Sequence, residues 1–150
     1  MDTKIYFIVL HSPQKQKIVC DLAEKCYLAN KRVVIFTEDP EKAKEIDQLL
    51  WTWKQSSFIP HIYCDTLEAS AYEPILITSH ISNNFDYHIL ILMDPVTTET
   101  LNKFEVVIEF AEKYDIACLS ASRERYKMYK SHNYQIETLQ PGEFLTTQIE

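Results

Sequence analysis

Lys4-Ile-Tyr-Phe-Ile-Val-Leu-His-Ser-Pro13 is the stretch on which the fold of this chain depends. From Ile5 to Leu10 it is apolar without alternation, which is typical of a strand buried on both faces of a sheet. Ser12-Pro13 then favours a helix start, with serine as the N-cap and proline at the first helical position. A buried strand that passes directly into a helix indicates an α/β protein.

The same order repeats farther along the chain. Arg32–Thr37 predicts a second buried strand, and Asp39-Pro40 opens a second helix with the same kind of cap. Strand–helix–strand–helix with short links predicts a parallel sheet with right-handed crossovers. Between residues 97 and 114 the early residues favour helix, but β-branched and aromatic residues favour a strand at the end. Helices are expected over about 13–30, 39–51 and 115–131, and further strands at Ile62–Cys64, Pro74–Thr78, His88–Met93, Phe104–Phe110 and Tyr134–Leu139.

These elements predict a single three-layer Rossmann-like α/β domain over residues 1–150, with a mostly parallel sheet and helices on both faces. Residues from about Gln140 to Glu150 are expected to form a flexible tail. The chain contains one glycine, Gly142, whereas loops that cradle phosphates need several. The fold is therefore expected to lack a nucleotide-binding glycine loop. P-loop NTPases and standard dinucleotide-binding domains are excluded.

Composition narrows the function further. The net charge is −7, which argues against direct DNA binding and against docking on an anionic membrane. The longest apolar run is too short for a membrane span or a signal peptide, so we expect a cytoplasmic protein. The four cysteines form no Cys-x-x-Cys pair and are expected to be reduced and buried. No cofactor and no metal are expected.

The segment Arg123–Lys130 departs from the acidic average. It carries four cations and one anion, whereas the rest of the chain sums to −10. A helical projection places Arg123, Tyr126, Lys127 and Lys130 on one face, which is expected to be solvent-facing. Such a face suits an acidic peptide with one hydrophobic anchor. The alternative is a solvated face whose cations complement the helix dipole. Ile116, Leu119 and Ser120 share the solvent-facing side, and Ala117, Cys118, Ala121, Arg125, Met128, Tyr129 and His132 are expected to face the core.

Arg125 is the one charged residue on that predicted core face. We expect it to pair with a buried carboxylate or carbonyl, whose identity the sequence does not give.

Three segments together resemble the chi subunit of bacterial DNA polymerase III holoenzyme. Ser122-Arg-Glu-Arg-Tyr-Lys-Met-Tyr-Lys130, followed by a strand, is similar to the last helix of that family. Leu50-Trp51 with Ser57-Phe-Ile-Pro-His61 matches its Leu-Trp…Ser-Phe-[Val/Ile]-Pro-His pattern, and Lys31-Arg-Val33 matches its Lys-Arg-Val. Asn30 and Asn133 stand where the family often has glycine, and asparagine is the next best residue in a left-handed cap.

The resemblance implies a non-catalytic adaptor, an accessory subunit of a DNA-directed DNA polymerase. Chi proteins bind the acidic C-terminal tail of single-stranded-DNA-binding protein, and they bind the psi subunit of the clamp loader. By this resemblance Arg123, Tyr126 and Lys127 would hold the tail, and the helical projection adds Lys130. A further family lysine corresponds to Leu119 here. The psi interface would comprise Trp51, Phe58, Ile59 and Pro60, whose alternative role is plain core packing.

The competing classes are a small cytosolic α/β enzyme and another kind of peptide-binding adaptor. Candidate polar residues for an enzyme follow strands or lie in loops, where α/β active sites often form. His61-x-x-Cys64 has a ligand-like spacing, but structural zinc needs four ligands. At Asp39 a helix cap explains the residue fully. The remaining candidates are His80, His88, Asp65, Asp86 and Asp94.

Overall fold

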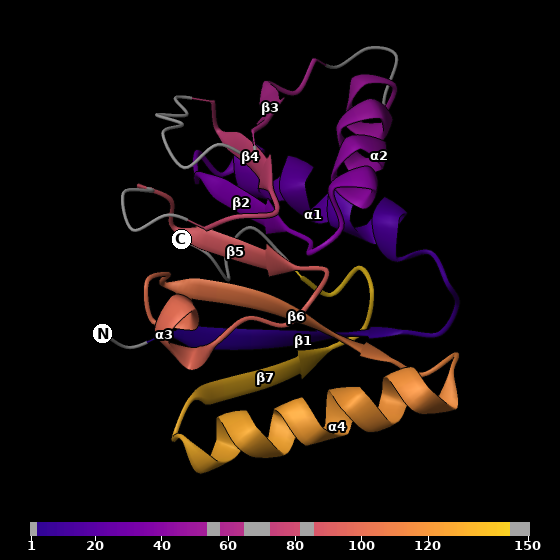
Figure 1. The fold of residues 1–150 in the computed structure, drawn as a ribbon, viewed down its shortest axis with the longest axis vertical. Helices are drawn as coiled ribbons and strands as arrows, with labels where there is room; N and C mark the ends of the chain where they lie inside the picture. Colours follow the sequence, from indigo (N-terminus) through magenta and orange to yellow (C-terminus); the bar gives the residue numbers. More distant parts are fainter. Residues whose placement is uncertain (1–2, 54–57, 65–72, 82–85, 145–150) are drawn as a thin grey trace.

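A computed structural model of the chain describes residues 3–53, 58–64, 73–81 and 86–144. Within these ranges seven strands form one sheet in the order β3-β4-β2-β5-β6-β1-β7, and every neighbouring pair is parallel (Figure 1). The strands are β1 (Lys4–Leu10), β2 (Val33–Phe36), β3 (His61–Tyr63), β4 (Ile75–Thr78), β5 (Ile89–Leu92), β6 (Val106–Glu112) and β7 (Gln135–Leu139). The helices are α1 (Lys15–Leu28), α2 (Pro40–Trp51), α3 (Thr98–Leu101) and α4 (Ile116–Ser131).

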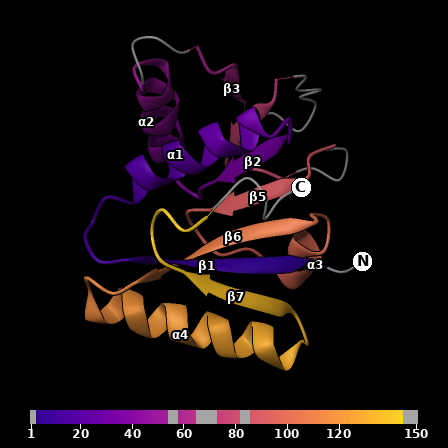
Figure 2. The ribbon, with the colours of Figure 1, turned by 180° about the vertical axis from the view of Figure 1, so that it is seen from behind.

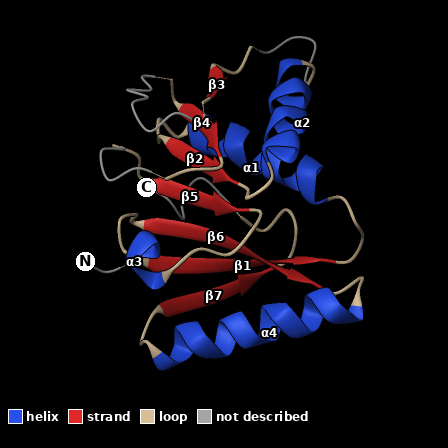
Figure 3. Ribbon diagram, in the orientation of Figure 1, coloured by secondary structure: helices blue, strands red, loops and turns tan. Residues whose placement is uncertain are grey.

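Helices cover both faces of the sheet, as the sequence predicts. The helices α1 and α2 pack on one face, where α1 crosses β2 in the view from behind (Figure 2). The helices α3 and α4 lie on the opposite face, with α4 along the end of the sheet formed by β1 and β7 (Figure 3). The three-layer α/β architecture is therefore confirmed.

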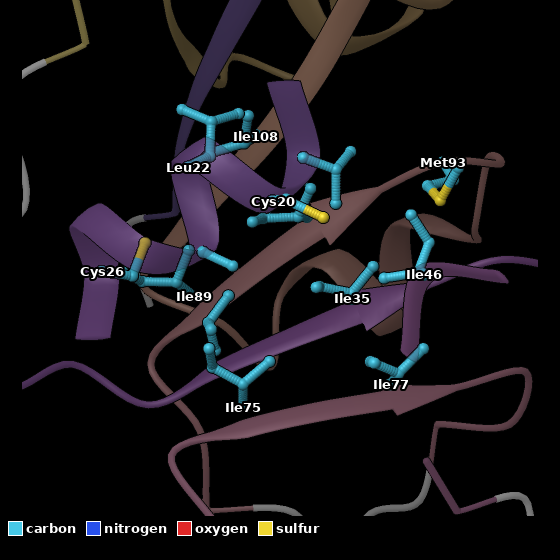
Figure 4. Close-up of a cluster of buried hydrophobic side chains, with 14 of the residues drawn as sticks. Cys20, Leu22, Cys26, Ile35, Ile46, Ile75, Ile77, Ile89, Met93 and Ile108 are labelled. Atoms are coloured by element: carbon cyan, nitrogen blue, oxygen red, sulfur yellow. The ribbon is translucent and has the colours of Figure 1, made fainter. Parts of the chain in front are cut away.

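Alternation along each central strand divides the core between the two faces. In β2, Ile35 belongs to the cluster under α1 and α2, whereas Val34 and Phe36 belong to the cluster on the other face. Figure 4 shows the first cluster, in which Cys20 of α1 and Ile46 of α2 lie against isoleucines of the strands. Because both faces are buried, the central strands read as unbroken apolar runs.

The start of α1 differs from the prediction. The helix begins at Lys15 with Gln14 as its N-cap, and the Gln14 side chain makes no cap hydrogen bond. Ser12 and Pro13 instead form a tight turn, in which the Gln14 N–H donates to the Ser12 carbonyl at 2.8 Å. The helix α2 begins as predicted, because Asp39 accepts a hydrogen bond from the Glu41 N–H at 3.0 Å.

Asn30 and Asn133 both adopt the left-handed conformation, as the sequence predicts. Asn30 follows α1 with φ of 58°, and Asn133 follows α4 with φ of 64°. After each one the chain turns back on the helix: the Lys31 N–H donates to the Cys26 carbonyl, and the Tyr134 N–H donates to the Tyr129 carbonyl. Both helices therefore end in Schellman-type caps.

The C-terminal part of the described chain is anchored rather than free. Phe144 is buried on the sheet face covered by α1, where its ring packs edge-on to Tyr6 with centroids 5.5 Å apart. The Phe144 carbonyl also accepts a hydrogen bond from Lys25. The expected loose tail therefore does not begin at Gln140, and residues 145–150 lie outside the described ranges. None of the described helices has the length and apolar character needed to cross a bilayer.

Candidate functional site

The helix α4 is fixed by a cap and by a narrow inward stripe. Asp115 caps it by accepting a hydrogen bond from the Ala117 N–H at 3.2 Å. The buried and half-buried residues recur every three or four positions, so they lie along one side of the helix. They are Cys118, Leu119, Ser122, Arg125, Tyr126 and Tyr129.

This stripe lies between the two faces predicted from the sequence. Ala117, Ala121, Met128 and His132 are exposed although they were expected in the core, and Leu119 and Tyr126 are half-buried although they were expected in solvent. The prediction erred because small and large apolar residues occur on both sides of the helical projection. The helix buries the larger Leu119 and Tyr126 side chains in preference to the two alanines, because larger apolar surfaces gain more on leaving water.

A pocket of about 240 Å³ opens between α4 and the sheet beside this stripe. Its apolar lining includes the Tyr126 ring, which packs edge-on to Phe7 of β1 with centroids 5.5 Å apart. Leu119 is part of this lining. The cations of the lining are Arg123 and Lys113. The uncharged lining residues are Phe7, Val9, Ala111, Leu119, Ser122, Tyr126, Thr138 and Gln140.

The predicted cations of α4 divide into two groups. Arg123 is exposed and lines the pocket, and it forms no ion pair among the described residues. Lys127 is exposed and lies 3.7 Å from the Glu124 carboxylate, outside the pocket lining. The Lys130 ammonium is 5.8 Å from the centroid of the Tyr126 ring. Arg123 and Tyr126 are therefore together at the pocket, with Lys127 and Lys130 farther along the same helix.

Arg125 pairs with a buried carboxylate, as its position predicts. It donates to both oxygens of Glu109 on β6, at 3.0 Å from Nε and at 3.2 Å from the terminal guanidinium nitrogen. Tyr129 donates to the same carboxylate at 2.9 Å. Burial, and next the negative charge of Glu109, raise the pKa of Tyr129, so its hydroxyl stays a neutral donor. This network sets the rotation of α4 and thereby directs Arg123 toward the pocket.

The residues of the second predicted interface separate into surface and core. Trp51 and Phe58 are 53% and 67% exposed, and their rings lie together with centroids 5.5 Å apart. Ile59 is buried in the core cluster under α1 and α2, and Pro60 is half-buried. The core-packing alternative is thus correct for Ile59. Trp51 and Phe58 form an exposed aromatic pair.

The polar residues considered for an enzyme have structural partners where they are described. The buried His61 ring contacts the carbonyls of Ile59 and Asp47 at 2.7 and 3.1 Å, and it packs at a tilt against the Trp51 ring. Asp94 accepts from Thr37 and from the Glu38 N–H, and His88 accepts from the Arg32 N–H. Asp39 caps α2, Asp86 lies 3.8 Å from Arg32, and the backbone N–H of His80 donates to the Thr78 hydroxyl. Asp65 lies outside the described ranges, and within those ranges no group of His, Cys, Asp and Glu residues could hold a metal ion.

A larger pocket, of about 790 Å³, lies at the carboxyl ends of β1, β5 and β6, where open α/β sheets commonly bind ligands. Its charged groups bind one another. Lys15 donates to the Glu112 carboxylate at 2.7 Å and to the Met93 carbonyl at 2.8 Å. Burial alone would raise the pKa of Glu112, but the hydrogen bond and charge of Lys15 outweigh it and hold the pKa below its usual value. This crevice therefore presents internal ion pairs rather than an open phosphate cradle.

Comparison with known proteins agrees with the three sequence segments. The family model described as DNA polymerase III chi subunit, HolC, matches residues 2–137. This chain belongs to that chi subunit family. DNA polymerase III subunit chi of Haemophilus influenzae is 30% identical over 129 residues, which are 85% of this chain and 88% of the relative. The Escherichia coli subunit is 25% identical over 123 residues, covering 82% and 83% of the two chains. The chain is thus a chi-family protein of DNA replication.

Solved structures share the fold at low sequence identity. T4 UvsW superposes on 92% of this chain and 41% of its own, with a TM-score of 0.64 and 12% identity. At that identity the likeness supports the α/β architecture alone.

The sequence analysis missed one of the two cations that line the pocket, Lys113. It precedes the helix cap and lies ten positions before Arg123, so no helical projection places the two together. One signal in the sequence could have identified Lys113. It directly follows an apolar strand, and ligand sites of α/β proteins form at the carboxyl ends of such strands.

Proposed function

We propose that this chain is a non-catalytic accessory subunit of the DNA polymerase III holoenzyme. In this role it links the clamp loader, through psi, to the acidic C-terminal tail of single-stranded-DNA-binding protein. Membership of the chi family supports the assignment to the holoenzyme. The observation that carries the tail-binding part is the pocket beside α4, which combines an apolar lining with Arg123.

The pocket suits the end of a peptide that is both aromatic and acidic. The Tyr126 ring is held against Phe7, so an inserted ring would meet a wall that is already ordered. Arg123 can donate two parallel hydrogen bonds to a carboxylate. Because Arg123 forms no ion pair among the described residues, binding a carboxylate there breaks no salt bridge within them.

Lys127 and Lys130 suit the acidic residues that precede the end of the tail. Both are exposed on α4, and their charges lie along the same helix as Arg123. Exposed lysines of this kind contribute mainly to the rate of association and less to affinity. They also make binding weaker at higher salt concentration.

The exposed pair Trp51 and Phe58 is the surface proposed for psi. Large aromatic residues are enriched in the buried centres of interfaces, whereas an isolated protein gains little from leaving two together in water. The buried His61 ring packs against the Trp51 ring, with ring centroids 4.6 Å apart. The proposed interface is therefore limited to Trp51, Phe58 and the half-buried Pro60. Ile59 lies in the core cluster and is left out of it.

The tail-binding proposal is tested by titrating the chain with a peptide that copies the tail of the organism's single-stranded-DNA-binding protein. We expect micromolar affinity, about −8 kcal/mol, that weakens as salt is added. Arg123→Ala should reduce affinity roughly tenfold or more, since hydrogen bonds to charged groups contribute about 1.5–3 kcal/mol. Lys44→Ala, on an exposed site of α2, is the matched control and should bind like the parent. Equal affinity of Arg123→Ala and the parent would refute the site.

A further inference from the structure

Lys113 approaches the same pocket as Arg123 from a different element. It directly follows β6, and its N–H donates to the Leu10 carbonyl at 2.8 Å, which continues the ladder between β6 and β1. Arg123 comes from the second turn of α4. Both side chains are exposed and both line the pocket, so its apolar lining has a cation from each of two elements.

The charge of Lys113 is available to a ligand. Among the described residues its side chain forms no salt bridge or hydrogen bond, and none of the residues that line this pocket is acidic. The nearby Lys15 is not available in this way, because its ammonium already donates to Glu112 and to the Met93 carbonyl. Arg125, in turn, is occupied by Glu109.

We propose that Lys113 determines specificity for a free chain end, by binding the terminal carboxylate of the peptide together with Arg123. This inference rests on the proposed function. If the terminal aromatic side chain enters the apolar pocket, its own main-chain carboxylate is the carboxylate nearest to the pocket. Lys113 and Arg123 are the cations that line the pocket, whereas Lys127 and Lys130 lie outside its lining. Two cations at one carboxylate distinguish a chain end from an internal acidic segment.

The test compares two tail peptides, one with a free C-terminal carboxylate and one with a C-terminal amide, each labelled at its N-terminus. Binding to the full chain is measured by fluorescence anisotropy at fixed salt. The parent should prefer the free acid by tenfold or more. Lys113→Ala and Lys113→Gln should each lower the affinity for the free-acid peptide about fivefold and change the affinity for the amide peptide little. The preference for the free acid over the amide should therefore become smaller. These figures follow from an exposed to half-exposed charge pair of about 1 kcal/mol.

Lys44→Ala again serves as the control and should retain the full preference of the parent. Thermal unfolding should be unchanged in both Lys113 variants, because the side chain is exposed. An equal loss of affinity for the acid and the amide peptides would overturn the inference. Lys113 would then attract any acidic peptide through its charge, without recognising the terminal carboxylate. No change with either peptide would also overturn it. If the parent binds neither peptide, the tail-binding function itself is wrong, and this inference is wrong with it.

Discussion

Replacing Arg125 by alanine tests the account of how α4 is held. In the parent, the guanidinium binds both oxygens of Glu109 and also donates to the Phe110 carbonyl at 3.3 Å. The side chains of Arg125 and Glu109 are 16% and 3% exposed, so the pair is largely removed from water. Arg125→Ala leaves a buried carboxylate with two remaining donors, the Tyr129 hydroxyl and the Phe110 N–H.

The loss can be placed within a known range. Breaking a buried ion pair by removing one partner costs about 3–5 kcal/mol. The lower end, about 3 kcal/mol, applies because two hydrogen bonds to Glu109 remain and Arg125 is partly exposed. For a domain of this size each kcal/mol lowers Tm by about 2–4 °C, so Tm should fall by about 10 °C. Arg125→Lys keeps the charge without the two-pronged geometry and should lose roughly half as much.

The measurement is urea and thermal unfolding followed by far-UV circular dichroism. Arg123→Ala, two positions earlier on the same helix, is the matched control. Its side chain is exposed and lines the pocket, so unfolding should change by no more than about 0.5 kcal/mol while peptide binding weakens. If Arg125→Ala unfolds at the same temperature and urea concentration as the parent, the buried network does not hold α4 and the reasoning is refuted.

Three further predictions concern other parts of the fold. Lys15→Ala should lower the free energy of unfolding at neutral pH, as measured by urea unfolding over a pH series. The difference in this free energy between variant and parent should shrink as the pH falls through the pKa of Glu112, which lies below its usual 4.5. The reason is that a protonated Glu112 no longer has a charge for Lys15 to stabilise. Asn133→Ala should cost about 1 kcal/mol in the same assay because its φ is positive, whereas Asn133→Gly should be close to neutral. Ile59→Ala should cost about 2–4 kcal/mol, whereas Trp51→Ala should cost far less and should abolish binding of psi, as measured by co-purification.

Most of the secondary structure could be predicted from the sequence, because each signal is local. The apolar run at Ile5–Leu10, the Asp39 cap and the two asparagine caps all act within a few residues of themselves. The start of α1 could not be predicted in the same way. Ser12-Pro13 satisfies the rules for a helix start and also those for a turn, and the chain uses it as a turn.

The candidate site was predicted in part. Arg123 and Tyr126 were identified and both line the pocket, and the buried partner of Arg125 was expected without being named. The predicted orientation of α4 was wrong at six residues, four expected in the core and two expected in solvent, because a helical projection treats each face as uniform. Such a projection does not show that burying one large ring gains more than burying two small side chains.

The sequence by itself determined the kinds of element, their order, the absence of a glycine loop for phosphates, and membership of the chi family. Tertiary structure decided which strand supplies the carboxylate for Arg125, where Phe144 docks, and that Lys113 and Arg123 line one pocket with Phe7. The physical reason is separation along the chain. Helix periodicity and caps act over a few residues, whereas Phe7 and Tyr126 meet only after β1 has been placed between β6 and β7.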